Sequence, residues 1–364
     1  MPPPTLFKYI GERALIGIGG LLVILLSLVL LTDLIENMRF ISKLSEGDFN
    51  LAVTLTLLRA PSLTLALFPF VFLFGSIWAF YQLNRRSELA VMRSAGLSIW
   101  RLLGPAALIA AFTGVVIITV IDPVSSGMLA YSERIKNIKQ GKDRNLMRVF
   151  DDGIWLRQQD ARMQILINAK TVDRDTSALK EITVWRFGPT GSFIERIDAE
   201  EAVLSGRTME MRDARLTPID SLQTRQTPVY AIRTSLKPED LRDRIAKPET
   251  ISLWALPNFI ILAEAAGLKT VRYHMRFHDL SSTPLKLLAM VLIAAAFSLR
   301  PLRNGGIFYL VSFSIGSGFL LYVLSEISKA LGESELVPVA LAAWTPALVA
   351  SLAAITTLLH FEDG

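Results

Sequence analysis

Residues Ala14–Leu31 read ALIGIGGLLVILLSLVLL, eighteen consecutive residues without a charged side chain. A helix rises about 1.5 Å per residue, so this run is about 27 Å long, close to the thickness of the hydrocarbon core of a bilayer. The run exceeds the apolar part of a secretory signal peptide, and Thr32–Glu36 after it offers no small-residue cleavage site. We therefore expect it to stay attached and to span a membrane.

Around this run the chain divides into apolar stretches and one charged segment. Of its 364 residues 51% are hydrophobic and 20% are charged, and more than half of the charges fall between Tyr131 and Thr250. This distribution predicts a membrane protein with one soluble domain. The net charge is only +5, and no other feature indicates nucleic-acid binding.

Further uncharged runs have the length of a membrane span. A shorter run, Leu287–Leu299, reaches that length if its helix begins near Asp279 and Lys286 extends toward the headgroups or faces a polar cavity. Six transmembrane helices are therefore expected. The remaining four runs are Ala60–Asn84, Leu102–Ile121, Asn304–Ser325 and Leu336–Leu359.

Basic residues in the short connections predict the orientation of these helices. With both termini in the cytoplasm, cytoplasmic segments contain eight Lys and Arg residues, and the short segments on the opposite side contain four. The charged domain is then outside the cytoplasm, in the periplasm of a double-membraned bacterium. The eight are Lys8, Arg13, Arg85, Arg86, Arg93, Arg101, Arg300 and Arg303; the four are Arg39, Lys43, Arg59 and Lys329.

The segment from about Asp122 to His278 is predicted to be rich in β-strands, because β-branched and aromatic residues alternate with polar ones between turn residues. Ile182, Val184 and Arg186, for example, fall on one face of a strand. The spacing indicates an antiparallel sandwich of six or more strands. The expected strands are Gly153–Gln158, Arg162–Val172, Leu179–Phe187, Ser192–Ser205, Arg207–Thr217 and Pro228–Ser235, with flanking helices at Ser125–Gly141 and at Ser252–Gly267, the latter interrupted by Pro257.

The sequence lacks the common catalytic motifs. Without cysteine it has no disulfide, thiolate zinc site or thiol nucleophile. It has no GxxxxGK[ST] phosphate loop, no GxSxG and no HExxH. His274 and His278 are spaced to share a helix face and could form a two-histidine metal site, but Arg272, Arg276 and Phe277 around them favour the start of a membrane helix. We expect no catalytic residue, metal or cofactor.

The connection between the second and third spans is predicted to contain a short cytoplasmic helix. Ser87 is placed to cap its N-terminus and Gly96 to end it, and Leu89 and Met92 share a face with Arg93 beside them. Such a helix is the surface that a membrane subunit offers to a peripheral partner. The alternative is a basic loop that only follows the charge rule of membrane topology, and the residues favour neither.

Basic residues also gather at the outer ends of the first three spans. Arg39 and Lys43 follow the first span, Arg59 begins the second, and Arg134 and Lys136 follow the third. Cations at this depth can hold the phosphates of an amphipathic lipid by charge-assisted hydrogen bonds. The alternative is pairing with acidic residues of the same helix.

Several stretches together resemble the lipopolysaccharide-export permeases of the LptF/LptG family, and LptG more closely than LptF. The resemblance covers essentially the whole chain, and its most specific part is the Arg86–Leu89 loop ending at Ala95–Ser98. The other matching stretches are Thr5–Ile10, Asp122-Pro123, Arg303–Gly306, Gly316–Phe319 and Ala342–Pro346.

The resemblance implies a non-enzymatic half-transporter: a membrane α-helical bundle of six transmembrane helices with an inserted all-β, jellyroll-like periplasmic domain. In that family an LptF-like subunit pairs with such a chain, and an LptB-like ATPase dimer docks beneath them. Lipopolysaccharide then passes through the jellyroll to an LptA-like periplasmic bridge, and an LptC-like accessory subunit contacts the first span at a lateral gate. The implied domains are 1–122 with a coupling helix at about 85–96, 123–278 with the jellyroll, and 279–364.

The resemblance also implies two sets of site residues. The coupling helix falls on Ser87–Ala95, with Glu88 meeting the ATPase. In the family, basic residues in the cavity hold the lipid phosphates. Here the end of the first span differs, because Asp33 and Glu36 precede Arg39 and Lys43. The ATPase-docking set is Arg86, Glu88, Leu89, Met92 and Arg93, and the lipid-binding set is Arg39, Lys43, Arg59, Arg134 and Lys136.

Two other classes of function stay open from the residues. The first is a mechanical membrane subunit of another ATP-driven complex that passes no lipid. The second is a membrane enzyme or secondary transporter acting alone, which needs a relay of intramembrane acids; only Glu326 and Lys286 are available for one.

Overall fold

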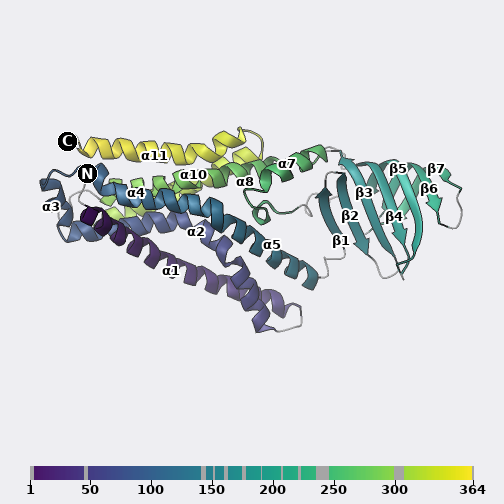
Figure 1. Ribbon diagram of the computed structural model, residues 1–364, viewed down its shortest axis with the longest axis horizontal. Coiled ribbons are helices and arrows are strands. Elements are labelled where there is room, and N and C mark those ends of the chain that lie inside the picture. The colour runs from purple at the N-terminus through teal and green to yellow at the C-terminus, as the bar shows by residue number, and fades with distance from the viewer. Residues whose placement is uncertain are drawn as a thin grey trace. The chain divides into compact units, whose positions relative to one another are not determined.

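The computed structural model shows two compact units (Figure 1). The first consists of Met1–Leu129 and His274–Gly364, and the second of Ala130–Tyr273, so the second is an insertion in the sequence of the first. The structure describes residues 4–44, 48–140, 145–150, 152–159, 163–173, 178–189, 191–205, 208–219, 223–234, 246–298 and 307–362. Some predicted positions lie outside these segments: Gly141, Arg162, Arg207, Ser235 and residues 299–306.

Long helices form the first unit. α1 and α2 pack along each other, and the short α3 connects α2 to α4. α4 continues through a π-helical turn, η1, into α5. The helices that lie in this unit wholly or in part are α1 (Pro4–Ser42), α2 (Phe49–Arg85), α3 (Glu88–Ser94), α4 (Ile99–Val116), η1 (Ile117–Ile121), α5 (Asp122–Lys139), α8 (Val271–Ser281), α9 (Thr283–Ser298), α10 (Ile307–Glu333) and α11 (Val339–Glu362).

This unit has the helices of a multi-pass membrane protein. In the described part of the chain, α1, α2, the α4–α5 continuation and α11 are long and apolar enough to cross a bilayer, and α8 with α9 makes a fifth span if the bent pair is one. α10 has 27 residues and no charge between Ile307 and Ser325, so it matches the remaining predicted run. α1 has 39 residues, about 58 Å, and therefore extends well beyond the hydrocarbon core.

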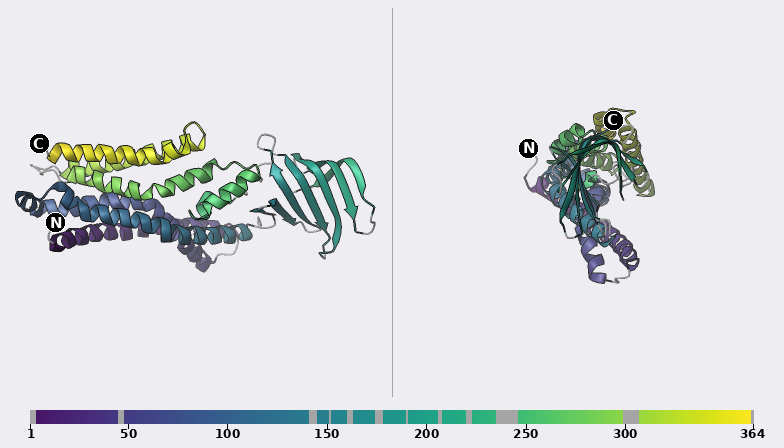
Figure 2. Two further views of the ribbon diagram at one scale, coloured as in Figure 1. Left: turned by 45° about the horizontal axis from the view of Figure 1, so that its top comes forward. Right: turned by 90° about the vertical axis from the view of Figure 1, so that its right-hand side faces the viewer.

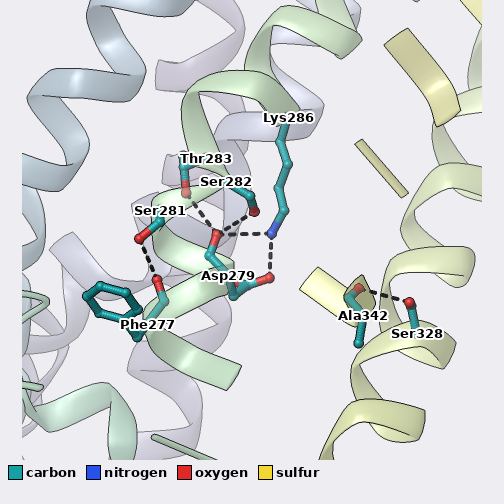
Figure 3. Close-up of polar contacts among 8 residues, drawn as sticks. All are labelled: Phe277, Asp279, Ser281, Ser282, Thr283, Lys286, Ser328 and Ala342. Carbon is teal, nitrogen blue, oxygen red and sulfur yellow. Dashed lines mark hydrogen bonds and ion pairs between the residues drawn. The ribbon is translucent and has the colours of Figure 1, made fainter. Parts of the chain in front are cut away.

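The predicted fourth span is bent. α8 and α9 meet at 50°, with Ser282 between them, and Pro284 has no N–H to donate to the preceding turn. One residue before the carbonyl that such an N–H would reach, the Asp279 carbonyl oxygen accepts hydrogen bonds from the hydroxyls of Ser282, at 2.8 Å, and Thr283, at 3.4 Å (Figure 3). The Lys286 ammonium pairs with the Asp279 carboxylate across the bend, so this cation is balanced within its own span.

Glycines allow two pairs of helices to approach closely. A β-carbon on Gly17 of α1 would lie 2.5 Å from the carbonyl oxygen of Gly75 on α2, and one on Gly75 would lie 2.6 Å from the α-carbon of Ile18. A β-carbon on Gly114 of α4 would lie 2.4 Å from the α-carbon of Pro284 on α9. Small residues at such crossings let helix backbones pack directly, which stabilises helix pairs in lipid.

The second unit contains one antiparallel sheet of seven strands, in which each strand pairs with the next in sequence. Its buried face is apolar, with Ile167, Ile182, Val184 and Ile197 at 1% exposure or less. The predicted antiparallel β domain is thus confirmed, including the inward face of β4. The strands are β1 (Asn145–Phe150), β2 (Gly153–Gln159), β3 (Gln164–Val172), β4 (Leu179–Phe187), β5 (Phe193–Ser205), β6 (Thr208–Pro218) and β7 (Arg225–Arg233).

Some details of this unit differ from the expectation. β1 was missed because charged residues surround its short apolar run. The described strands form one continuous curved sheet (Figure 2), because every sequential pair is hydrogen-bonded and no break separates two layers. Pro257 lies in the first turn of α7 (Leu256–Ala265) and does not interrupt it. A backbone N–H in the first turn has no partner within the helix, so a proline there removes no helical hydrogen bond.

Candidate functional site

α3 is a short helix that is held firmly at its C-terminus. The N–H groups of Gly96 and Leu97 donate to the carbonyl oxygens of Arg93, at 2.9 Å, and Met92, at 3.2 Å. Gly96 has φ +78° and ends the helix, as predicted; the two hydrogen bonds make this end a Schellman motif. Ser87 precedes the helix, but its φ is 58° and its side chain makes no capping bond, so it supplies a sharp turn from α2 instead.

The two apolar residues of the predicted docking set face the helical unit. Leu89 and Met92 are 4% and 9% exposed and belong to its core. On the other side of α3, Val91 is 66% exposed and Arg93 is exposed too. Leu89 and Met92 therefore anchor α3 to the membrane helices, and the surface open to a partner is the one that contains Val91 and Arg93.

Glu88 lies at the boundary between these two faces. Its carboxylate accepts from the Tyr9 hydroxyl of α1, at 2.9 Å from Oε2 and 3.1 Å from Oε1. The guanidinium of Arg86 lies 3.9 Å from Oε1, and 28% of the Glu88 side chain is exposed. A carboxylate has about four acceptor positions, so Glu88 can still accept from an external donor.

The predicted lipid-binding cations are in different environments. Arg39 and Lys43 are exposed at the end of α1. Arg134 is exposed on α5, where Lys136 is half-buried. These two belong to the second unit, and Arg39 and Lys43 belong to the first. Arg59 differs from all four, because its guanidinium lies 2.6 Å from the Asp33 carboxylate of α1.

The Asp33–Arg59 ion pair is part of a polar network between α1 and α2. Asp33 is 5% exposed and also accepts from the Asn37 amide at 2.8 Å. The same amide lies 3.0 Å from the Thr56 hydroxyl on α2. Sequence reasoning missed this network because its partners are on two helices, and no local spacing connects Asp33 with Arg59.

A second long-range ion pair joins two parts of the first unit. Arg276 of α8 donates to Asp122 at 2.8 Å, and the Asp122 side chain is fully buried. Asp122 follows the π-helical turn directly and begins α5. The pair thus fixes the irregular point of the third span against α8.

These features define a class of protein. A bundle of long apolar helices carries an all-β insertion and presents a short helix, anchored on one face, between its second and third spans. Such an architecture is that of a multi-pass membrane protein.

The comparisons identify the family. The profile of the family described as "Lipopolysaccharide export system permease LptF/LptG" matches residues 8–360, and the chain belongs to this family. It is 26% identical over 340 residues to the lipopolysaccharide export system permease protein LptG of Haemophilus influenzae, covering 92% of this chain and 91% of that one. It is 24% identical over 338 residues to LptG of Escherichia coli K12, with 90% of each chain covered.

Proposed function

We propose that this protein is the membrane permease subunit of an ATP-driven lipopolysaccharide exporter. It takes lipopolysaccharide from the inner membrane and passes it to a periplasmic bridge, and a separate ATPase supplies the energy. The observation that carries the proposal is α3: Leu89 and Met92 fix one face of this helix in the bundle core, and Glu88, Val91 and Arg93 remain accessible to a partner.

The proposal includes the arrangement in the membrane. Both termini and α3 are cytoplasmic, residues 1–122 and 279–364 contain the spans, and residues 123–278 contain the periplasmic domain. The excess of basic residues in the loops on the α3 side supports this orientation. The partners are an LptF-like second permease, an LptB-like ATPase dimer, an LptC-like accessory subunit and an LptA-like bridge. The relatives are named as proteins of a lipopolysaccharide export system, which supports partners of that kind in general and none of these four individually.

Contacts with the lipid phosphates are assigned to exposed cations. Arg39, Lys43 and Arg134 have exposed side chains, and Lys136 is partly accessible. Arg59 is the weakest member of the predicted set, because Asp33 already balances its charge. An amphipathic lipid would meet the exposed cations without first breaking a buried ion pair.

Retention of the ATPase tests the docking surface. Val91→Asp and Glu88→Ala should each reduce the amount of ATPase that co-purifies in mild detergent by about tenfold or more, because both change the accessible face of α3. Glu12→Ala is the matched control: it removes a carboxylate that is 57% exposed near the start of α1, where it lies 3.8 Å from the Lys8 ammonium.

The outcomes separate the candidate functions. Normal ATPase retention by both α3 variants would refute docking at this helix. ATPase retention by the wild type without co-purifying lipopolysaccharide would instead favour the mechanical membrane subunit. Thermal unfolding of each variant checks that the bundle is intact.

A further inference from the structure

A side-chain hydrogen bond connects α3 to the first span. The Tyr9 hydroxyl of α1 donates to the Glu88 carboxylate, with oxygen–oxygen distances of 2.9 and 3.1 Å, although the residues are 79 positions apart. In the described part of the chain, it is the one side-chain hydrogen bond between α1 and α3. A hydrogen bond to an ionised acceptor is about twice as strong as one between neutral groups.

The Tyr9 ring is fixed on both sides. It is half-buried and packs against the core of the helical unit. The guanidinium of Arg13, one helical turn later, lies 5.2 Å from the ring centroid, a cation–π contact. A ring held in this way presents its hydroxyl to Glu88 in one orientation, so little side-chain entropy is lost when the hydrogen bond forms.

The other contacts of α3 differ in kind. Leu89 and Met92 are held by apolar packing, which depends on buried area and has no preferred direction. Such packing resists removal of α3 but resists small sliding movements less. The Tyr9–Glu88 hydrogen bond is directional, so α3 cannot shift along α1 without breaking it.

Among the four helices that qualify singly as membrane spans in the described residues, α1 has the smallest buried share in its most apolar stretch. Only 17% of its most apolar window is buried, against 50% for α2, 28% for the third span and 33% for α11. One face of α1 is held on α2 at Gly17 and Asp33, and its exposed face has little packing within this chain to oppose a movement.

We propose that Tyr9 is a positioning residue that couples α3 to α1, so that a movement imposed on α3 by the ATPase displaces the first span. This inference rests on the proposed function, because it takes α3 as the docking helix. It adds the route by which the work of the ATPase reaches a transmembrane helix.

Tyr9→Phe tests the inference in the intact complex reconstituted in proteoliposomes with lipopolysaccharide. The variant keeps the ring, its packing and the Arg13 contact, and removes only the hydroxyl. We expect ATPase retention and ATP hydrolysis within about twofold of wild type, and about a fivefold or greater drop in lipopolysaccharide released per ATP, because a charge-assisted hydrogen bond is lost. Tyr81→Phe on α2 is the matched control, because the Tyr81 hydroxyl has no hydrogen bond to a described residue and its ring contacts Trp78.

Each result has a definite meaning. Wild-type release per ATP in Tyr9→Phe overturns the inference, and so does loss of the ATPase from this variant, which would make the hydroxyl part of docking. A thermal unfolding temperature equal to wild type, together with the drop in release per ATP, supports transmission rather than a structural role. Failure of the proposed function is distinguishable, because Glu88→Ala would then keep the ATPase.

Discussion

At the scale of single residues, the environment of a charge decides what it can bind. Arg59 has the position of a phosphate ligand in the sequence, at the outer start of the second span. In the structure its guanidinium lies 2.6 Å from Asp33, whose side chain is 4% exposed. A buried carboxylate and its cation are stable only as a pair, because either one alone would be desolvated without compensation.

Replacing Asp33 should therefore destabilise the α1–α2 pair. Asp33→Ala leaves Arg59 without its counter-ion, and we expect a loss of about 2–4 kcal/mol in the free energy of unfolding, measured by denaturation in detergent. Glu36→Gln, which removes an exposed carboxylate one helical turn later, should change it by less than about 0.5 kcal/mol.

A double variant distinguishes pairing from simple loss of packing. Asp33→Ala with Arg59→Leu should be more stable than Asp33→Ala alone, because no charge is left buried without a partner. Strictly additive losses in the double variant would show that the two residues do not interact.

At the scale of elements, helix packing depends on which face of a helix a glycine occupies rather than on how many glycines the helix contains. Gly17, Gly19 and Gly20 fall within one turn of α1, yet only Gly17 faces a backbone, that of Gly75 on α2. A β-carbon on Gly19 or Gly20 would meet nothing within 4 Å. The crossing of α1 and α2 thus depends on one of the three.

These three glycines provide an internally controlled experiment. Gly17→Ala should separate α1 from α2 and cost about 1–3 kcal/mol by overpacking. Gly19→Ala and Gly20→Ala should be neutral or slightly stabilising, because alanine favours the helix. The measurement is the thermal unfolding temperature of each variant in the same detergent. Equal effects at all three positions would contradict the close crossing.

Element types were largely predictable, and their irregularities were predictable only in part. Long uncharged runs identify spans, and alternation identified six of the seven strands, because both patterns are local. The bend at Ser282 was not predicted, although Pro284, which lacks a helix N–H, is a local signal for it. The close approach of Pro284 to Gly114 of another helix is contained in no local pattern. In α3, the end at Gly96 followed from local chemistry, whereas the turn at Ser87 did not.

At the scale of the whole molecule, the proposed orientation separates α3 from the β unit by the membrane. Because the chain has no cysteine, single-cysteine variants report position without background. Ser205→Cys, at the exposed end of β5, should react with a membrane-impermeant maleimide in spheroplasts. Ser94→Cys, exposed on α3, should react only after the membrane is disrupted. Labelling of both in intact spheroplasts would contradict the proposed orientation.

By itself the sequence determined which segments form long apolar helices, where the β insertion lies and that a short helix follows the second of them, because chain length, hydrophobicity and alternation are local properties. The tertiary structure alone decided that Leu89 and Met92 face the bundle, that Asp33 pairs with Arg59, and that Tyr9 joins Glu88. The partners in each of these contacts are brought together by the crossing of helices. Many charged residues and hydroxyls of this chain have similar sequence surroundings. Which of them become partners depends on how the helices pack, and no local pattern contains that geometry.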